Sequence, residues 1–479
     1  MKLMIYLRLF LHYFSIFCIV FTYLLNAVYI VQIIVSAVEI KKTLRRSKRK
    51  DHLFFQTSQN MIPSSILVPA HNEQETVVEN IRALLRLDYP EHEVIVINDG
   101  STDLTHQNIL SSFHLVEDTT PFRVAIPTQK VRTVYRCVDF PNLVYVDKEN
   151  GGKADSLNAG INLSAYPLVT TIDADSLLER DALLKLNIRF LEEPSTVAVG
   201  GTVRIINGSN MEDGKVLRQG LPKKALVRFQ MIEYFRAFFG GRLSWNQSNA
   251  ILIISGAFGS FSKKALIECR GYSTSTIGED MEVIVKLHHH FRKKKQDYKI
   301  AYILDPICWT QAPEKLADFR SQRRRWQVGL VNTLLTYKTM FLNPQYGKVG
   351  LLAVPYFWIF DVIGPIIEFL GYIIIPLSYL FGELSLFYFL AFFVAALLLG
   401  MVLSIGGLVL ELYGGKHHIS PKYLILLMLF ALLENFGYRQ LATIYRVEGV
   451  LKFRHLRHRW GKIGRQTFAS TADDEPKDE

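Results

Sequence analysis

Cysteine is scarce in this sequence, and the few that occur are scattered. The 479 residues contain four, at Cys18, Cys137, Cys269 and Cys308, and no two of them form a C-x-x-C pair. This spacing argues against a disulfide framework and against a zinc site. It fits a reducing, cytosolic setting for the polar part of the chain.

Charged residues are missing from long stretches. Residues 9–38 contain no Asp, Glu, Lys or Arg, which is enough chain to span about 30 Å of hydrocarbon. Residues 386–410 also lack charge, and residues 349–380 carry only Asp361 and Glu368. A shorter run at 423–433 either lies on or re-enters the membrane, or crosses it together with the residues that follow, against the charge rule. We expect Asp361 and Glu368 to face the interior of the helix bundle, because a charge facing lipid is costly.

The positive charge of the chain is concentrated beside these apolar stretches. The net charge is +11, and seven of the ten residues at 41–50 are basic. A second basic cluster, at 446–466, follows the last apolar run. Basic clusters that flank membrane segments follow the positive-inside rule, so this distribution points to a membrane and away from nucleic acid as a partner.

The N-terminal apolar run resembles an anchor more than a signal peptide. Its basic cluster lies on the C-terminal side, and no small-residue cleavage site is evident. We therefore expect an uncleaved anchor in a multi-pass protein of the plasma membrane. The domain from residue 60 onward would be cytosolic, the link 381–385 outside and the link 411–422 inside.

Residues 60–330 have the pattern of a soluble α/β domain. Short β-rich runs such as "SSILVPA", "HEVIVIND", "NLVYVDKE" and "LVTTIDAD" alternate with helix-like stretches such as "ETVVENIRALLRL". This alternation predicts βαβ units and a parallel sheet that is buried on both faces. The expected organisation is an anchor (1–40), a basic cytosolic linker (41–59), the α/β domain (60–330), an amphipathic interface helix (331–348), a C-terminal membrane region with two spans and a third spanning or re-entrant segment (349–446), and a basic then acidic tail (447–479).

Acidic residues follow two of the predicted strands. Asp99 ends the strand in "VIVINDGSTD", and Asp173 and Asp175 end the strand in "LVTTIDADS". Ligands of open parallel sheets bind at the carboxyl ends of the strands. Two carboxylates that flank one residue there can share Mg²⁺ or Mn²⁺, which reaches a diphosphate. The alternative is that these side chains cap the following helices.

Three further motifs carry polar side chains of chemical interest. "NGGKADSLNAG" offers glycines for close backbone approach and Lys153 for a phosphate, and "GEDME" places Glu279 and Asp280 at a predicted helix start. The acidic pair could instead be favoured by the helix dipole alone. "QRRRW" (322–326) could be a solvated basic helix face, although a tryptophan gains little from such a surface.

The three histidines at 288–290 adjoin "FRKKK" and are interpreted as a solvated helix end.

Taken together, these motifs resemble the membrane-integrated family 2 glycosyltransferases, which include cellulose, hyaluronan and poly-N-acetylglucosamine synthases. The resemblance covers residues 62–330 and rests on "VPAHNE", "NDGSTD", "GGKADSLNAG", "DAD", "SGAFGSF", "GED" and "QRRRW" in this order. It implies an α/β GT-A domain, Rossmann-like with a mostly parallel sheet, plus an α-helical transmembrane region. The chain has "GED" where many relatives have "TED", a change outside the catalytic pair.

The resemblance also implies a role for each matching residue. Asp280 would be the general base. The residues that would bind the nucleotide sugar are Pro69, Ala70, Glu73, Asp99, Lys153 and Asp173. The D-x-D motif that would bind Mg²⁺ or Mn²⁺ is Asp173 and Asp175. The residues that would line the acceptor and product path are Ser255, Gly256, Gln322, Arg325 and Trp326, with Arg325 near the diphosphate and Trp326 stacking on the acceptor sugar.

The expected function is that of an inverting, processive β-glycosyltransferase. It would use a UDP-sugar, with UDP-N-acetylglucosamine ahead of UDP-glucose, to elongate a bacterial exopolysaccharide and help export it. Its partners would be this donor, the growing polysaccharide, the lipid bilayer and accessory export or regulatory subunits. Two alternatives are transfer of one sugar to a lipid acceptor, and a transport or scaffold protein with an inactive nucleotide-binding domain.

Overall fold

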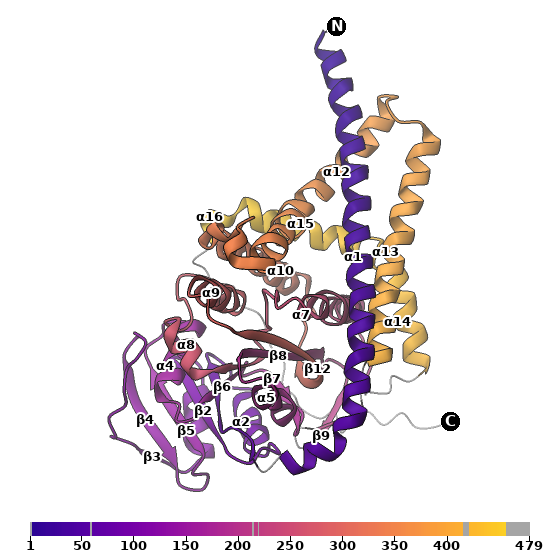
Figure 1. Cartoon of the computed structure of the whole chain (residues 1–479). Coiled ribbons are helices and arrows are strands. Elements are labelled where there is room, and N and C mark those ends of the chain that lie inside the picture. Colours follow the sequence, from indigo (N-terminus) through magenta and orange to yellow (C-terminus); the bar gives the residue numbers. More distant parts are fainter. Residues whose placement is uncertain (1, 58–59, 213–214, 219, 415–420, 457–479) are drawn as a thin grey trace.

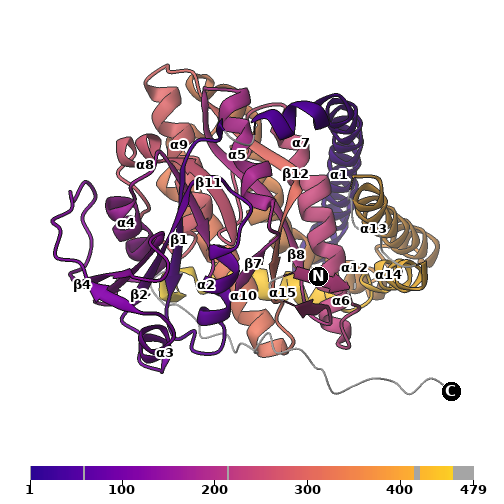
Figure 2. The ribbon, with the colours of Figure 1, turned by 90° about the horizontal axis from the view of Figure 1, so that it is seen from below.

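The protein combines an α/β domain with a bundle of long apolar helices. The computed structural model describes residues 2–57, 60–212, 215–218, 220–414 and 421–456. Helix α1 (Lys2–Thr57) runs along one side of the α/β domain and extends beyond it, with α13 (Leu386–Gly414) beside it (Figure 1). Seen from below, α1, α13 and α14 (Pro421–Leu433) gather on one side of the α/β domain (Figure 2).

The four strands expected from the sequence form the parallel half of the main sheet. They are β1 (Ser64–Ala70), β2 (His92–Asp99), β5 (Leu143–Lys148) and β6 (Leu168–Ile172), adjacent in the order β5-β2-β1-β6. Each pairs in parallel with its neighbour, so their carboxyl ends lie at one edge of the sheet. Because both faces of these strands are covered, their side chains are almost all buried.

The other half of the ten-stranded sheet is mixed rather than mostly parallel. Strand β11 (Phe258–Ser262) lies antiparallel between β6 and β8 (Thr196–Ile205), and β12 (Lys299–Thr310) runs parallel to β8. Antiparallel pairing brings the residues just before β11 next to those just after β6. The remaining strands are β3 (Leu115–Glu117), β4 (Val131–Cys137) and β7 (Ser176–Leu178) in the same sheet, and β9 (Asn210–Glu212) with β10 (Lys215–Arg218) in a separate ribbon.

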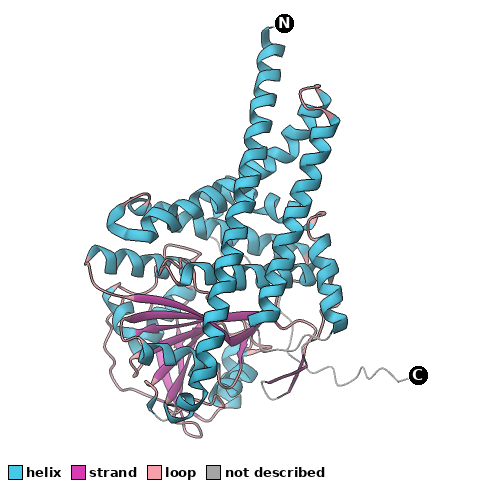
Figure 3. Cartoon of the chain, turned by 45° about the vertical axis from the view of Figure 1, so that its right-hand side comes forward, coloured by secondary structure: helices cyan, strands magenta, loops and turns pink. Residues whose placement is uncertain are grey.

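Amphipathic helices cover the sheet. In α2 (Val77–Leu85), the buried residues Val77, Ile81 and Leu84 follow the spacing of one helix face. Figure 3 shows the strands confined to one end of the molecule, with helices around and beyond them. The other helices of this region are α3 (Thr105–Ser112), α4 (Lys153–Leu163), α5 (Ala182–Glu192), α6 (Ala225–Phe235), the π-helical η2 (Arg236–Arg242), α7 (Leu243–Asn246), α8 (Lys263–Glu268), α9 (Glu279–Lys293) and α10 (Leu316–Thr336).

Within the described ranges, three helices are long and apolar enough to cross a membrane. They span Lys2–Arg45, Val349–Leu380 and Phe389–Gly414. The second is built from η5 (Val349–Ala353), α11 (Val354–Tyr356), η6 (Phe357–Ile363) and α12 (Gly364–Leu380). Residues Lys422–Leu433 and Tyr438–Leu451 would count as a fourth span only as a pair bent by 58°. The second member of this pair belongs to α15 (Tyr438–Leu451), which packs against α10 and α12, and a short α16 (Phe453–Leu456) follows.

In two segments, the secondary structure differs from what the sequence led us to expect. Residues 41–59 were expected to be a linker, but α1 continues as one helix to Thr57. Residues 331–348 were expected to form an interface helix, but α10 ends at Thr336 and two short turns follow, η3 (Lys338–Met340) and η4 (Pro344–Tyr346). Val331, Leu334, Met340 and Tyr346 of this stretch pack into a core with Met281 and Val285 of α9. Most of the expected tail, residues 457–479, lies outside the described residues.

Candidate active site

A large cavity connects the carboxyl ends of the parallel strands with the apolar helices. Its volume is about 1690 Å³, and its walls come from the α/β domain, from α10 and from α1, α12, α13 and α15. Every residue to which the sequence assigned a role lines it: Pro69, Ala70, Glu73, Asp99, Lys153, Asp173, Asp175, Ser255, Gly256, Asp280, Gln322, Arg325 and Trp326. The fold therefore gathers the whole set at one place.

At one end of the cavity, Asp99 organises the loop that precedes α4. Its Oδ1 accepts hydrogen bonds from Lys148 Nζ at 2.7 Å and from the Gly151 amide at 2.9 Å, and its Oδ2 accepts one from the Gly152 amide at 2.8 Å. Lys148 is fully buried and also contacts Asp155 Oδ2 at 2.7 Å. Sequence reasoning missed Lys148 and Asp155, because nothing in their local pattern shows that they meet Asp99.

The residues at the end of β1 form the neighbouring wall. Pro69 and Ala70 end the strand beside Ile97 and Asn98 of β2. Glu73 follows in a turn and is buried, with its amide donating to Thr105 Oγ1 at 2.7 Å. This wall and the Asp99 loop flank a space at the carboxyl edge of the sheet, where open α/β sheets bind their ligands.

Lys153 lies at the centre of a cluster of carboxylates. Its Nζ contacts Asp173 Oδ1 and lies 3.4 Å from Glu279 Oε1. Burial alone would lower the pKa of Lys153, but the charges of Asp173 and Glu279 outweigh it and raise that pKa. Burial also raises the pKa of Glu279. The first residue of α4 thus brings a firmly protonated cation to the acidic end of β6.

The Asp173 and Asp175 pair fits a divalent cation. Burial raises the pKa of Asp175 to about 7, and the negative charge of Asp173 adds to this rise. A bound cation would relieve this crowding of negative charge. Within the described ranges, no group of three or more His, Cys, Asp or Glu side chains could hold a metal by itself. Two carboxylates are nevertheless a suitable protein contribution for Mg²⁺, which takes its other ligands from phosphates and water.

Asp280 lies in the first turn of α9, against the loop that precedes β11. Its Oδ2 accepts a hydrogen bond from the Gly256 amide at 3.3 Å, and its Oδ1 accepts one from the Met281 amide at 2.8 Å. A Cβ at position 256 would lie 2.9 Å from Lys153 Nζ and 3.3 Å from the Asp280 Cβ. Glycine at 256 therefore permits the close approach of these two charged side chains.

The His288 side chain corrects the interpretation of the three histidines as a solvated helix end. It is fully buried within α9, with Nε2 2.8 Å from the Ile251 carbonyl oxygen and Nδ1 2.5 Å from the Tyr298 hydroxyl. The neighbouring basic residues suggested a solvent-facing turn, but position 288 lies on the face of α9 that packs against the sheet.

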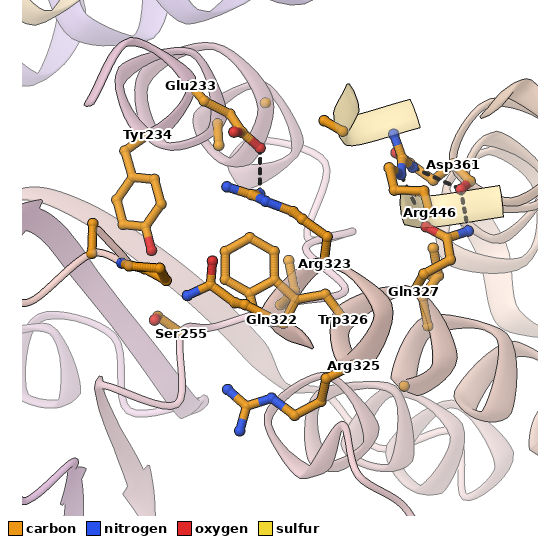
Figure 4. Close-up of a pocket in the computed structure, with 18 of the residues that line it drawn as sticks. Glu233, Tyr234, Ser255, Gln322, Arg323, Arg325, Trp326, Gln327, Asp361 and Arg446 are labelled. Carbon is orange, nitrogen blue, oxygen red and sulfur yellow. Dashed lines mark hydrogen bonds and ion pairs between the residues drawn. The ribbon is translucent and has the colours of Figure 1, made fainter. Parts of the chain in front are cut away.

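The "QRRRW" motif lies on α10 and is not a solvated basic face. Gln322 and Arg323 are buried, while 43% of Trp326 is exposed and it lines the cavity (Figure 4). Arg323, to which the sequence assigned no role, donates from Nη1 to Glu233 Oε1 at 2.5 Å and lies over the Trp326 ring. The ring stacking was foreseeable from the helical spacing of 319, 323 and 326, but the contact with Glu233 was not.

Polar groups continue the cavity wall toward the apolar helices. Asp361 Oδ1 accepts a hydrogen bond from Arg446 Nη2 at 3.2 Å, and the Asp361 carbonyl oxygen accepts one from Gln327 Nε2 at 2.8 Å (Figure 4). Glu368 accepts from Tyr372 and from Thr443. Asp361 and Glu368 both line the cavity, which confirms the prediction that they face the bundle interior.

This combination of an α/β sheet, acidic strand ends and apolar helices is that of a GT-A glycosyltransferase with helices long and apolar enough to span a membrane. The family model described as "Glycosyl transferase family 2" matches residues 65–268. A second model, "Glycosyl transferase family group 2", matches residues 168–432, which is more than half of the chain. The chain belongs to glycosyltransferase family 2, and it is a glycosyltransferase.

Two synthases that share one name are similar to this chain. A poly-beta-1,6-N-acetyl-D-glucosamine synthase of Staphylococcus epidermidis is 31% identical over 342 residues, which cover 68% of this chain and 70% of the relative. A synthase of the same name from Staphylococcus aureus (strain COL) is 29% identical, over 62% of this chain and 63% of the relative.

Solved structures are more distant. A mannosyltransferase from Pyrobaculum calidifontis, in complex with GDP-Man and Mn²⁺, is 16% identical with a TM-score of 0.46 and covers 90% of this chain and 99% of its own. TarS of S. aureus is 16% identical with a TM-score of 0.33, over 57% of this chain and 40% of its own. The family assignment therefore rests on the sequence matches.

Proposed function

We propose that this protein is an inverting, processive β-glycosyltransferase that elongates an exopolysaccharide from a UDP-sugar and passes the product into the membrane. One observation carries the proposal. The cavity that holds Asp173, Asp175 and Asp280 is continuous with the polar positions Asp361 and Glu368 among the apolar helices. A polymer that grows in such a cavity can move forward into the helical region without leaving the protein.

The residues around Asp280 support a direct displacement. The acceptor hydroxyl oxygen would attack C1 of the donor sugar, the bond from C1 to the diphosphate would break, and UDP would leave with the electron pair. Asp280 would take the hydroxyl proton, which is a task for a positioned carboxylate. Because attack comes from the side opposite the leaving group, the configuration at C1 inverts.

The positively charged side chains of Lys153 and Arg325 would stabilise the departing UDP. Lys153 and Arg325 both line the cavity, and Lys153 contacts Asp173 directly. Asp173 and Asp175 would hold a Mg²⁺ or Mn²⁺ ion, which when bound supplies positive charge to the diphosphate. The buried Lys148, Asp99 and Asp155 cluster would keep the Gly151–Gly152 loop in place beside the nucleotide.

The donor we propose is UDP-N-acetylglucosamine, with UDP-glucose next. The relatives from S. epidermidis and S. aureus are named as synthases of poly-beta-1,6-N-acetyl-D-glucosamine, which supports this order. We also propose a multi-pass position in the plasma membrane with residues 60–330 in the cytosol. The three candidate spans and the basic residues at 41–50 support this placement.

A donor panel tests the proposal. Purified protein in lipid nanodiscs would be given radiolabelled UDP-N-acetylglucosamine or UDP-glucose, and both UDP release and product length would be measured. We expect polymer from one of these donors, and long chains even when the acceptor is in large excess over the enzyme. A product limited to one sugar on a lipid would contradict processive elongation, and the absence of UDP release would contradict the catalytic assignment.

A further inference from the structure

An arginine lies over the indole of Trp326, and 43% of this residue is exposed. Arg323 lies on the preceding turn of α10, and its Cζ lies 4.5 Å from the centroid of the Trp326 ring. The same guanidinium also lies over Phe319, with Cζ 4.6 Å from that ring's centroid. Phe319, Arg323 and Trp326 are spaced by four and three residues, so the helix itself stacks them.

A carboxylate from another helix fixes the position of Arg323. Glu233 of α6 accepts from Arg323 Nη1 at 2.5 Å, and the Tyr438 hydroxyl of α15 donates to the same carboxylate. Arg323 Nε and Nη2 are buried and make no hydrogen bond to any residue in the described ranges. Among the described residues, the guanidinium is therefore held by its ion pair with Glu233 and by its contacts with two rings.

We infer that Arg323, anchored by Glu233, is a positioning residue that holds the Trp326 indole in one orientation in the cavity. It covers one face of the indole and leaves only the other face for the acceptor sugar. The inference rests on the proposed function, since it assigns Trp326 to the acceptor chain. Its physical basis is that a flat cation on one face of an indole favours one ring orientation. A sugar ring can then stack on the opposite face, because 43% of the Trp326 residue is exposed and it lines the cavity.

The sequence alone does not assign this role. Arg323 occupies the first of the two variable positions in the Q-x-x-R-W pattern of Gln322–Trp326. Its neighbours Arg320 and Arg324 instead pair with Glu448 on α15. These arginines of α10 therefore have two different partners: Arg323 pairs with Glu233, whereas Arg320 and Arg324 pair with Glu448. Arg320 provides a matched control, because it is one turn away, carries the same charge and makes no ring contact with Trp326.

The test compares variants that separate charge from stacking. Arg323→Met removes both, while Arg323→Lys keeps a cation near Glu233 but has no flat face to lie on the indole. The double variant E233Q/R323M removes both charges and leaves no unpaired carboxylate. All three should raise the KM for a β-linked N-acetylglucosamine oligosaccharide acceptor by roughly tenfold. The KM for UDP-sugar and the UDP release without acceptor should not change, and Arg320→Gln should match wild type.

A double-mutant cycle with Trp326→Ala decides whether Arg323 acts through Trp326. If it does, adding R323K to W326A causes no further loss, because the group that Arg323 positions is already gone. Additive losses, an equal fall in donor and acceptor parameters, or an R323K variant that behaves as wild type would overturn the inference.

Acrylamide quenching of tryptophan fluorescence gives a readout that needs no turnover. R323M should increase the quenching because it uncovers the second face of Trp326, and this increase should vanish in a Trp326→Phe background. An unchanged quenching curve would overturn the inference whatever the activity. Wild-type protein that makes no polymer would instead refute the proposed function and leave the quenching result as the test of the stacking.

Discussion

Gly278 and Gly329 are in backbone contact, so that a Cβ on Gly278 would lie 2.8 Å from the Cα of Gly329. Gly278 precedes α9, which carries Asp280, and Gly329 is one turn after Trp326 on α10. This contact sets the distance between the proposed base and the proposed acceptor platform. It explains why the acidic and the arginine-tryptophan motifs meet although about 40 residues separate them in the sequence.

Gly329→Ala should therefore separate α9 from α10. The added methyl group would meet backbone atoms of Gly278 and cannot be relieved by a side-chain rotation, and such overpacking costs about 1–3 kcal/mol. A displacement of about 1 Å can cost about 10²-fold in rate. Elongation should fall more than donor affinity does, as measured by polymer yield and by UDP binding.

Gly364→Ala is the control for this prediction. Gly364 begins α12 and is not among the residues that line the cavity, and an added Cβ there would come no closer than 3.6 Å to the Ile359 carbonyl oxygen, the nearest atom it would meet. Wild-type elongation in G329A would show that the contact does not set the geometry of the site.

Removal of divalent cations should abolish donor turnover. EDTA-treated protein should release no UDP, and added Mg²⁺ or Mn²⁺ should restore the activity. Asp175→Ala should lose the metal-dependent part of UDP affinity in a titration with and without Mg²⁺, because one of the two strand-end carboxylates is gone. Asp181→Asn is the matched control, since Asp181 pairs with Lys185 at the start of α5. Full activity in EDTA would refute the metal role.

Stability should decline as the pH falls from about 6.5 toward 4, in part through His288. Burial lowers the pKa of His288 from 6.5 to about 4. Above pH 6.5 the imidazole is neutral in both states. Below it, the unfolded chain binds a proton that the folded chain does not bind until about pH 4, so the free energy of unfolding falls, by about 3 kcal/mol over the full window.

Thermal unfolding of wild type and His288→Gln at pH 7.5 and pH 5 measures this contribution. The variant should be less stable at pH 7.5, where it loses the contacts with Ile251 and Tyr298, and should lose less on acidification. Equal losses in the two proteins would show that His288 does not carry the pH dependence.

Residues 60–330 should be inaccessible from outside intact cells. A cysteine at Lys264, an exposed position, should resist an impermeant thiol reagent, whereas one at Ser385 in the link expected outside should react. All four native cysteines are buried, which keeps the background low. Ready labelling at position 264, or protection at position 385, would reverse the proposed topology.

Local patterns were sufficient for the parallel half of the fold. The four β-rich runs became β1, β2, β5 and β6, because short runs rich in β-branched residues between polar turns favour strands. The antiparallel placement of β11 was not predictable, since the direction of a strand depends on partners far along the chain. The same limit applies to the helical turns after Thr336, whose apolar residues pack against α9.

For the site, strand-end position and motif order were sufficient to name the residues that line the cavity. The residues that hold them were missed. Lys148 meets Asp99 from 49 residues away and Arg323 meets Glu233 from 90 residues away, so no local spacing reveals either contact. Charge also misled, because the arginine run was open to interpretation as a solvated face, yet Arg323 is buried once Glu233 and two rings surround it.

The most direct test of the account is the rate of polymer synthesis by Asp280→Asn. Asparagine is nearly isosteric and can still accept the hydrogen bond from Gly256, but it cannot take the acceptor proton. Base catalysis is typically worth about 10²–10⁴-fold, or roughly 3–5 kcal/mol. Purified D280N should therefore make polymer about 10²–10⁴-fold more slowly than wild type, with UDP-sugar affinity and folding unchanged. Polymer synthesis at more than about a tenth of the wild-type rate would contradict the account, and Glu279, which lies beside Lys153, would become the candidate base.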